Sequence, residues 1–152
     1  MTERKYAKYF ITDFHHPPPP EAIKKHEEQR KAGNYVEGVE LYSLGDEVIK
    51  GALYSSCVLL KDKKGAGAVE MTAAHSHDFD EVLLFAGTVK DDPHDLGGEI
   101  ELWLEDEQYI ITRGCLVFVP KGIKHCPLII RRIDSPIFLF TAGNDAVYTK
   151  IT

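Results

Sequence analysis

The chain has 152 residues, of which 43% are hydrophobic and 28% are charged, and its net charge is -6. This length and composition are typical of one globular domain that can bury a real core. The acidic balance and the absence of a basic stripe argue against a nucleic-acid partner or an anionic membrane surface. No apolar run approaches the length that crosses a bilayer.

The cysteines bear on the compartment in which the protein works. Cys57, Cys115 and Cys126 cannot all pair within one chain, and their spacing is not that of a disulfide framework or a zinc knuckle. The amino terminus has no apolar core of the kind found in signal peptides. We therefore expect a cytoplasmic protein.

Residues 1–34 differ in character from the rest of the chain. Residues 6–12 are rich in strand-forming side chains and predict a short strand. The four prolines at 17–20 favour a polyproline spacer. Residues 21–32 predict a charged surface helix that ends at Gly33-Asn34. We expect this segment to pack on the main domain.

Residues 35–152 show a different pattern, in which short apolar stretches alternate with Gly- and Asp-containing turns. The expected strands cover 36–44, 52–60, 69–75, 81–87, 100–105, 108–112, 116–119, 127–133, 136–141 and 146–151. Many short, evenly spaced strands indicate an all-β sandwich or barrel. Residues 88–98 are expected to form its longest irregular connection, and such loops are often functional.

The most informative stretch runs from His75 to Gly87. In an extended strand the side chains of His75 and His77 point to the same face, and Glu81 shares their parity. Two neutral imidazoles and one carboxylate form a mixed nitrogen and oxygen set that suits Fe, Mn, Ni, Cu or Zn. This stretch predicts a metal site.

A matching ligand follows downstream. Residues 114–125 read as a strand, a tight turn and a histidine that begins the next strand. Pro120 fixes the entry to the turn, and Gly122 can adopt a positive φ. The turn could therefore direct His125 back toward His75 and His77.

Together the two stretches resemble the cupin superfamily, whose motifs read HxHxxxE followed by a glycine, and GxxxxxPxGxxH. The matching residues are His75, His77, Glu81 and Gly87 in the first motif, and Gly114, Pro120, Gly122 and His125 in the second. The asparagine that often follows the second motif is replaced by Ile129, which is not a ligand position.

The resemblance implies a single-domain jelly-roll β-barrel over residues 35–152 and a homodimer. It also implies one divalent transition metal (Fe, Mn, Ni, Zn, Cu or Co), held by His75, His77, Glu81 and His125. Four protein ligands leave two positions of an octahedral ion for a small-molecule ligand.

The residues of matching parity on the motif strands are apolar, and they are expected to line the site. They are Met71, Ala73, Leu83 and Phe85. An apolar lining favours chemistry in which the metal does most of the work. We therefore predict an enzyme that acts on a small oxygenated metabolite, of the dioxygenase type first and a Lewis-acid isomerase or decarboxylase second. The alternative is a non-catalytic module that uses the metal to bind or sense a small ligand.

Candidates for a proton carrier are few. His94 lies in the 88–98 loop and could reach over the mouth of the barrel, although a plain loop histidine is the more common case. Tyr54 and Tyr42 are the other candidates. His15 and His16 precede the prolines and are expected to be solvated.

Overall fold

Nine strands dominate residues 4–145 and 147–152, which are the residues described by the computed structural model of the chain. They are β1 (Tyr35–Leu44), β2 (Ser55–Lys64), β3 (Val69–Thr72), β4 (Glu81–Gly87), β5 (Asp95–Leu104), β6 (Glu107–Arg113), β7 (Cys115–Val119), β8 (His125–Ile133) and β9 (Ile137–Gly143). A 3-10 helix, η1 (Ala7–Tyr9), and an α-helix, α1 (Pro20–Lys31), precede them.

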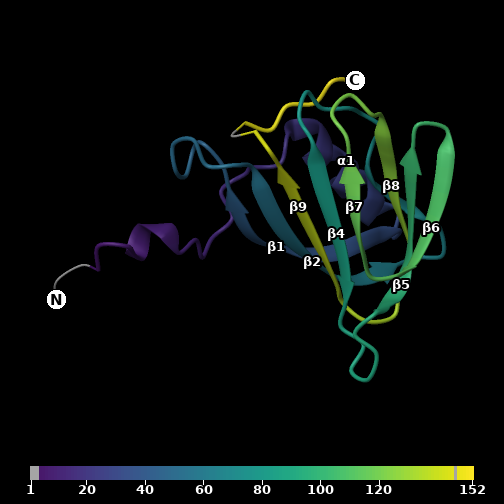
Figure 1. The fold of residues 1–152 in the computed structure, drawn as a ribbon. Helices are drawn as coiled ribbons and strands as arrows, with labels where there is room; N and C mark the ends of the chain where they lie inside the picture. Colours follow the sequence, from purple (N-terminus) through teal and green to yellow (C-terminus); the bar gives the residue numbers. More distant parts are fainter. Residues whose placement is uncertain (1–3, 146) are drawn as a thin grey trace.

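The strands form two antiparallel sheets that face each other (Figure 1). One sheet has the order β1-β2-β9-β4-β7 and the other β3-β8-β5-β6. The predicted all-β jelly roll is confirmed. Among the described strands no hydrogen-bonded ladder joins the two sheets at their edges, so the fold is a two-sheet sandwich rather than the closed barrel that the sequence predicted.

The core lies between the sheets and positions the strand that carries Glu81. Along β4, burial alternates, and Glu81, Leu83 and Phe85 all face inward. Phe85 packs in one cluster with Ile100 of β5 and Ile130 of β8, and all three are fully buried. Burial of each such side chain contributes about 1.5–3 kcal/mol. The core therefore fixes the face of β4 on which Glu81 lies.

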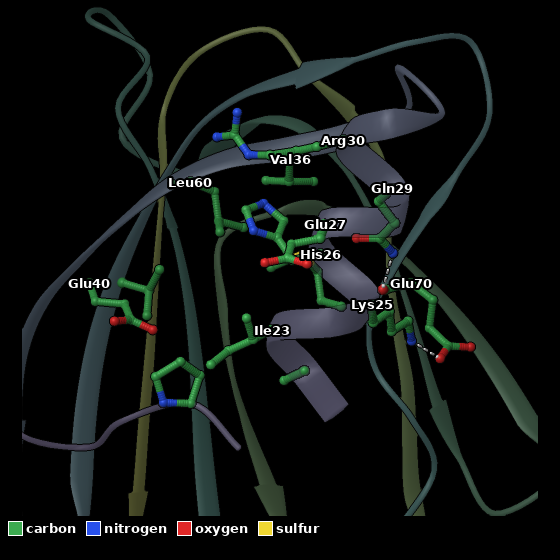
Figure 2. A pocket seen from close by; sticks show the side chains of 15 residues that line it. Ile23, Lys25, His26, Glu27, Gln29, Arg30, Val36, Glu40, Leu60 and Glu70 are labelled. Carbon is green, nitrogen blue, oxygen red and sulfur yellow. Dashed lines mark hydrogen bonds and ion pairs between the residues drawn. The ribbon is translucent and has the colours of Figure 1, made fainter. Parts of the chain in front are cut away.

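Helix α1 confirms the helix predicted over 21–32, and it begins with Pro20, whose fixed φ suits a first helical position. None of its residues is buried. Gln29 Nε2 donates to the carbonyl oxygen of Glu70 at 3.0 Å, and Lys25 pairs with the Glu70 carboxylate (Figure 2). Polar contacts thus hold the helix against β3, and the helix covers a groove between itself and the strands. Within the described residues no helix combines the length and the apolar character needed to cross a membrane.

Both ends of the chain differ from the predictions. Residues 6–12 contain η1 instead of a strand. The segment lies to one side of the sheets, borders them only through Tyr9 and Ile11, and pairs with no strand among the described residues (Figure 1). The strand expected over 146–151 is reduced to a single bridge between Ile151 and Ser76, and residue 146 lies outside the described residues.

The irregular connection expected over 88–98 is shorter, because β5 begins at Asp95.

Candidate metal centre

Main-chain hydrogen bonds bring the two motif stretches together. The N–H of His75 donates to the carbonyl oxygen of His125 at 3.0 Å, and the N–H of His125 returns a bond of 2.8 Å. Gly122, whose φ is +82°, donates its N–H to the carbonyl oxygen of His77 at 2.9 Å. The positive φ that the turn was predicted to need is present, and the turn sets His125 beside the first motif.

Asp80 fastens the segment that leads into Glu81. Its Oδ1 accepts from the N–H of Lys121 at 2.8 Å, and its Oδ2 accepts from Asn144 Nδ2 at 3.2 Å. The N–H of Asn144 also donates to the Asp80 carbonyl oxygen at 3.1 Å. One carboxylate thus ties together the first motif, the turn of the second motif and the end of β9. No sequence pattern points to this contact.

The three motif histidines are all oriented through Nδ1, which lies against a main-chain carbonyl oxygen. The carbonyls belong to Ala73 for His75 (2.8 Å), to Ile123 for His125 (3.1 Å) and to Thr149 for His77. A carbonyl oxygen can only accept, so each Nδ1 carries a proton. In the neutral imidazole the lone pair is then on Nε2, which is the arrangement found in metal-binding histidines.

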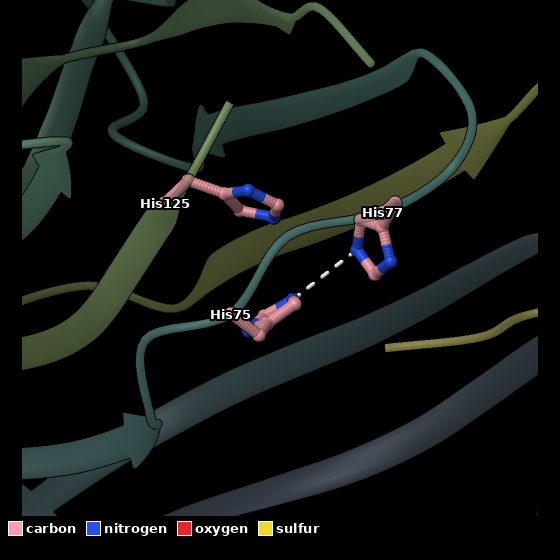
Figure 3. Close-up of side chains that lie close together, drawn as sticks. All are labelled: His75, His77 and His125. Carbon is pink, nitrogen blue, oxygen red and sulfur yellow. Dashed lines mark hydrogen bonds between the residues drawn. The ribbon is translucent and has the colours of Figure 1, made fainter. Parts of the chain in front are cut away.

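The three Nε2 atoms and the Glu81 carboxylate converge; we call these four residues the tetrad. His75 Nε2 and His77 Nε2 are 3.2 Å apart (Figure 3), and Glu81 Oε2 lies 2.9 Å from His125 Nε2 and 3.4 Å from His77 Nε2. Two donors bound to one ion at about 2.1 Å are about 3.0–3.4 Å apart in octahedral or tetrahedral geometry. These separations fit a single ion.

All four side chains are buried, and burial controls their charge. Burial lowers the pKa of His75 to about 4, so this imidazole is neutral at pH 7. For Glu81, burial acts to raise the pKa, and a hydrogen bond from a protonated imidazole of His125 or His77 outweighs it and lowers the pKa to about 2. The tetrad therefore offers neutral nitrogens and one negative oxygen.

Two of these donors have no hydrogen-bond partner among the described residues. Glu81 Oε2 and His125 Nε2 are buried and face each other at 2.9 Å, yet neither takes part in a hydrogen bond within residues 4–145 and 147–152. With Nδ1 protonated, no hydrogen lies between them, and two buried acceptors in contact are unfavourable. A cation among the four donors removes this conflict. The donor set thus fits the divalent transition metal predicted from the sequence.

Two aromatic residues that the sequence analysis did not single out complete the surroundings. The Phe79 ring stacks on His77 with centroids 4.5 Å apart. The Tyr148 hydroxyl lies 3.4 Å from His75 Nε2, and burial raises the pKa of this phenol above its usual range. Tyr148 belongs to the segment expected to be a strand and is far from the motifs in sequence, so no local pattern pointed to it.

The four apolar residues predicted to line the site fall into two pairs. Leu83 and Phe85 lie on the same face of β4 as Glu81. The prediction for Met71 and Ala73 is wrong, because both side chains are exposed. A register shift after Glu70 interrupts the alternation of β3 and turns Met71 into the groove beneath α1, while Ala73 contributes its carbonyl oxygen to His75.

The predicted proton carriers do not reach the tetrad. His94 is exposed, and its carbonyl oxygen accepts from Gly114 N–H at the Gly87 end of β4, opposite Glu81. Tyr42 is exposed on the outer face of the five-stranded sheet. Tyr54 packs on the ring of Tyr148, with ring centroids 4.4 Å apart, and it is Tyr148 that contacts the tetrad. Burial raises the pKa of Tyr54 as well.

Two hollows lie near the site. The groove beneath α1 has a volume of about 610 Å³ and a floor of Val36 and Leu60, but no residue of the tetrad lines it (Figure 2). A second cavity of about 510 Å³ is bounded by Tyr54, Tyr148 and Lys150. Because Tyr148 contacts His75, the second cavity is the one adjacent to the tetrad.

Comparisons with known proteins rest on structure. No protein-family model matches the sequence, and no curated protein matches it. The chain is similar to an oxalate oxidase in complex with the substrate analogue glycolate, with a TM-score of 0.53 and 11% identity, over 99% of this chain and 66% of that one. It is also similar to an oxalate decarboxylase (TM-score 0.48, 15% identity, 79% of this chain and 28% of that one). A third similar structure is KdgF from Halomonas sp. (TM-score 0.42, 14% identity, 70% of this chain and 77% of that one).

Identities this low bear on the fold alone. The chain spans only 28% of the oxalate decarboxylase and 54% of a second oxalate oxidase structure, so the activities of those longer proteins are not transferred to it. The similarity at a TM-score of 0.53 nonetheless extends over 99% of the chain. The chain therefore has the cupin fold that its two motifs predict.

Proposed function

We propose that this chain is a metal-dependent cupin enzyme that acts on a small oxygenated metabolite. Oxidation of the dioxygenase type is the first form of the proposal, and Lewis-acid isomerisation or decarboxylation is the second. The observation that carries it is the tetrad, in which three imidazole lone pairs and one carboxylate converge in a buried site.

The residues of the tetrad would hold the ion, and each has a defined task. A divalent transition metal bound there supplies Lewis acidity or exchanges electrons. The Nδ1 contacts of the three histidines fix their rings, and Glu81 contributes the negative charge. Phe79, which is buried and stacked on the His77 ring, excludes water from one side. Tyr148 keeps its proton at the hydroxyl that faces His75.

A second candidate is a module that binds or senses a small ligand without turnover. It is favoured by the scarcity of acids and bases around the tetrad, because His94 and Tyr42 lie elsewhere and Tyr54 is shielded by Tyr148. A site whose nearby phenol, Tyr148, keeps its proton can hold a ligand but assists few proton transfers.

An oxygen electrode separates the two candidates. Protein loaded with Fe(II) or Mn(II) is mixed with diketones, thiols, catechols and hydroxy acids, and product formation is followed in parallel. We expect turnover of at least one class by the natural protein and none by His125→Ala. Ligand-dependent thermal stabilisation without turnover for any class would instead establish the binding module.

We further propose a homodimer formed through the outer face of the five-stranded sheet. The strand register there creates three rows without a charged residue: Leu44, Ser55, Ala142, Val82 and Phe118; Tyr42, Cys57, Phe140, Leu84 and Leu116; and Val39, Leu59, Phe138 and Ala86. Leu116 is 70% exposed and Phe118 60%. A chain with a net charge of -6 that leaves these three rows uncharged has a surface suited to a second copy.

The amino-terminal segment supports the same proposal. Tyr6 and Phe10 are exposed on a segment that extends away from the sheets. Tyr9 already borders the outer face beside Tyr42 and Phe140. A second copy could cover these aromatic side chains together with the outer face.

The compartment is proposed on the chemistry of the cysteines. Cys57, Cys115 and Cys126 are all free thiols. Burial raises the pKa of the Cys126 thiol to about 12, which keeps it unreactive. Three thiols without a disulfide support a reducing compartment such as the cytoplasm.

A further inference from the structure

Tyr148 is held against the tetrad by a short segment near the end of the chain. Ile151 exchanges two main-chain hydrogen bonds of 2.8 Å with Ser76, the residue between the first two histidines. The carbonyl oxygen of Thr149 lies against His77 Nδ1. Tyr148 immediately precedes these anchors, so its position is coupled to the two histidines.

The Tyr148 side chain stands between the tetrad and the 510 Å³ cavity. One side of its ring packs near His77, with centroids 4.8 Å apart, and its hydroxyl reaches His75 Nε2 at 3.4 Å. It also lines the cavity with Tyr54 and Lys150. A ligand that entered the tetrad from this cavity would have to pass the phenol.

Charges in the cavity wall indicate which ligands suit it. Lys150 makes no ion pair within the described residues, and its Nζ lies 5.7 Å from the centre of the Tyr148 ring. Glu47 is paired with His16 at 2.7 Å, and Glu40 lies where the cavity meets the groove beneath α1. The free cation beside Tyr148 favours a small anion with oxygen acceptors.

The hydrogen-bonding role of Tyr148 must change when a metal is bound. Its O–H now donates to the lone pair of His75 Nε2, because Nδ1 of that ring already carries the proton. A metal ion uses this same lone pair. The phenol, protonated at neutral pH in the ordinary way, then needs another acceptor close to the tetrad.

We propose that Tyr148 contacts the ligand: its O–H donates a hydrogen bond to an oxygen of a small carboxylate that enters from the cavity it lines. This inference rests on the metal-binding role proposed above. It makes Tyr148 a determinant of ligand binding rather than a further metal ligand.

Co(II) and acetate test the proposal without any need for turnover. The d–d absorption of Co(II)-loaded protein reports both metal uptake and the binding of acetate. Hydrogen bonds to charged groups contribute about 1.5–3 kcal/mol, so Tyr148→Phe should weaken acetate binding by at least about tenfold. Co(II) affinity should stay within about threefold of the natural protein.

Tyr109→Phe is the matched control, because it removes the same hydroxyl from a tyrosine that is exposed on β6, away from the cavity. This variant should bind acetate like the natural protein. Equal acetate affinity for Tyr148→Phe and the natural protein would overturn the proposal, as would loss of Co(II) from Tyr148→Phe, which would make the phenol a metal ligand. If the natural protein itself takes up no Co(II), the proposed function fails together with this inference.

Discussion

The Nδ1 contacts of the tetrad histidines determine what the site can bind. Each ring donates to a carbonyl oxygen, which leaves a lone pair on the nitrogen that faces the other donors. The Nε2 atoms of the three histidines and the carboxylate oxygens of Glu81 cannot form hydrogen bonds with one another in this state, because all of them are acceptors. The chain thus holds together a set of groups that a cation stabilises and that is unfavourable without one.

This arrangement predicts how the metal-free protein responds to acid. The pKa of His75 is about 4 in the folded chain, against an ordinary 6.5, so between these pH values the unfolded state binds more protons. The stability contributed by the neutral imidazole is complete above about pH 6.5 and is lost as the pH falls toward 4. The loss is at most about 3 kcal/mol. Glu81, with its pKa lowered to about 2 from 4.5, extends the loss below pH 4.5.

Thermal unfolding in the presence of a chelator, from pH 7.5 to pH 4, measures this loss. We expect the melting temperature of the natural protein to fall over that range and to fall less steeply for His75→Gln. His94→Gln changes an exposed histidine and should keep the natural slope. Identical slopes for all three proteins would show that burial of His75 does not govern the acid response.

At the scale of single elements, Gly87 shows why the first motif ends in glycine. A Cβ at this position would lie 2.7 Å from the carbonyl carbon of Leu96 and closer still to the carbonyl oxygen of Asp95. Asp95 and Leu96 are the first two residues of β5. The absence of a side chain at the end of β4 lets β5 begin against it, and this keeps the inner face of β4 in place.

Gly87→Ala should therefore destabilise the protein through a main-chain clash. We expect a cost of about 3 kcal/mol, because overpacking against main chain cannot be relieved by a side-chain rotation. Gly33→Ala is the control: its φ is +69° but its surroundings are open, so only the backbone penalty of about 1 kcal/mol applies. Urea unfolding measures both values, and equal costs would contradict the close approach of β4 and β5.

The elements also show what the sequence could and could not predict. Strands such as β4 were predictable because alternation reports a buried face, and His75, His77 and Glu81 follow from their shared parity. Alternation failed for Met71, where a register shift breaks the period. The strand expected over 6–12 failed because strand-forming side chains need a neighbouring strand, which only the folded structure reveals.

Contacts between distant segments form the other part that sequence patterns cannot supply. Asp80 meets Asn144, and Tyr148 meets His75, across more than sixty residues of chain. No periodicity links such positions. His125 was predictable only because the second motif resembles a known pattern, whereas Tyr148 belongs to no motif.

At the scale of the whole molecule, the proposed homodimer can be tested on its outer face. Leu116 and Phe118 are highly exposed on the edge strand β7, on the face of the sheet opposite to the inward-facing Glu81. Light scattering after gel filtration should give twice the chain mass for the natural protein. It should give a single chain mass for the double variant Leu116→Lys and Phe118→Lys, because two buried lysines disfavour the contact.

A matched change on the opposite sheet provides the control. Tyr109 and Ile110 are exposed on β6, and lysines at these two positions should leave the dimer intact. A natural protein that is a single chain at micromolar concentration, or a β7 variant that remains a dimer, would exclude the outer face as the interface.

Metal content tests the central claim most directly. Protein incubated with a divalent transition metal and then dialysed should retain about one ion per chain, as determined by elemental analysis. His125→Ala, with its fold checked by circular dichroism, should lose most of that ion because one of the four convergent donors is removed. His94→Ala should keep it, since His94 lies at the opposite end of β4. Equal metal occupancy in His125→Ala and the natural protein would contradict the assignment of the tetrad as the metal site.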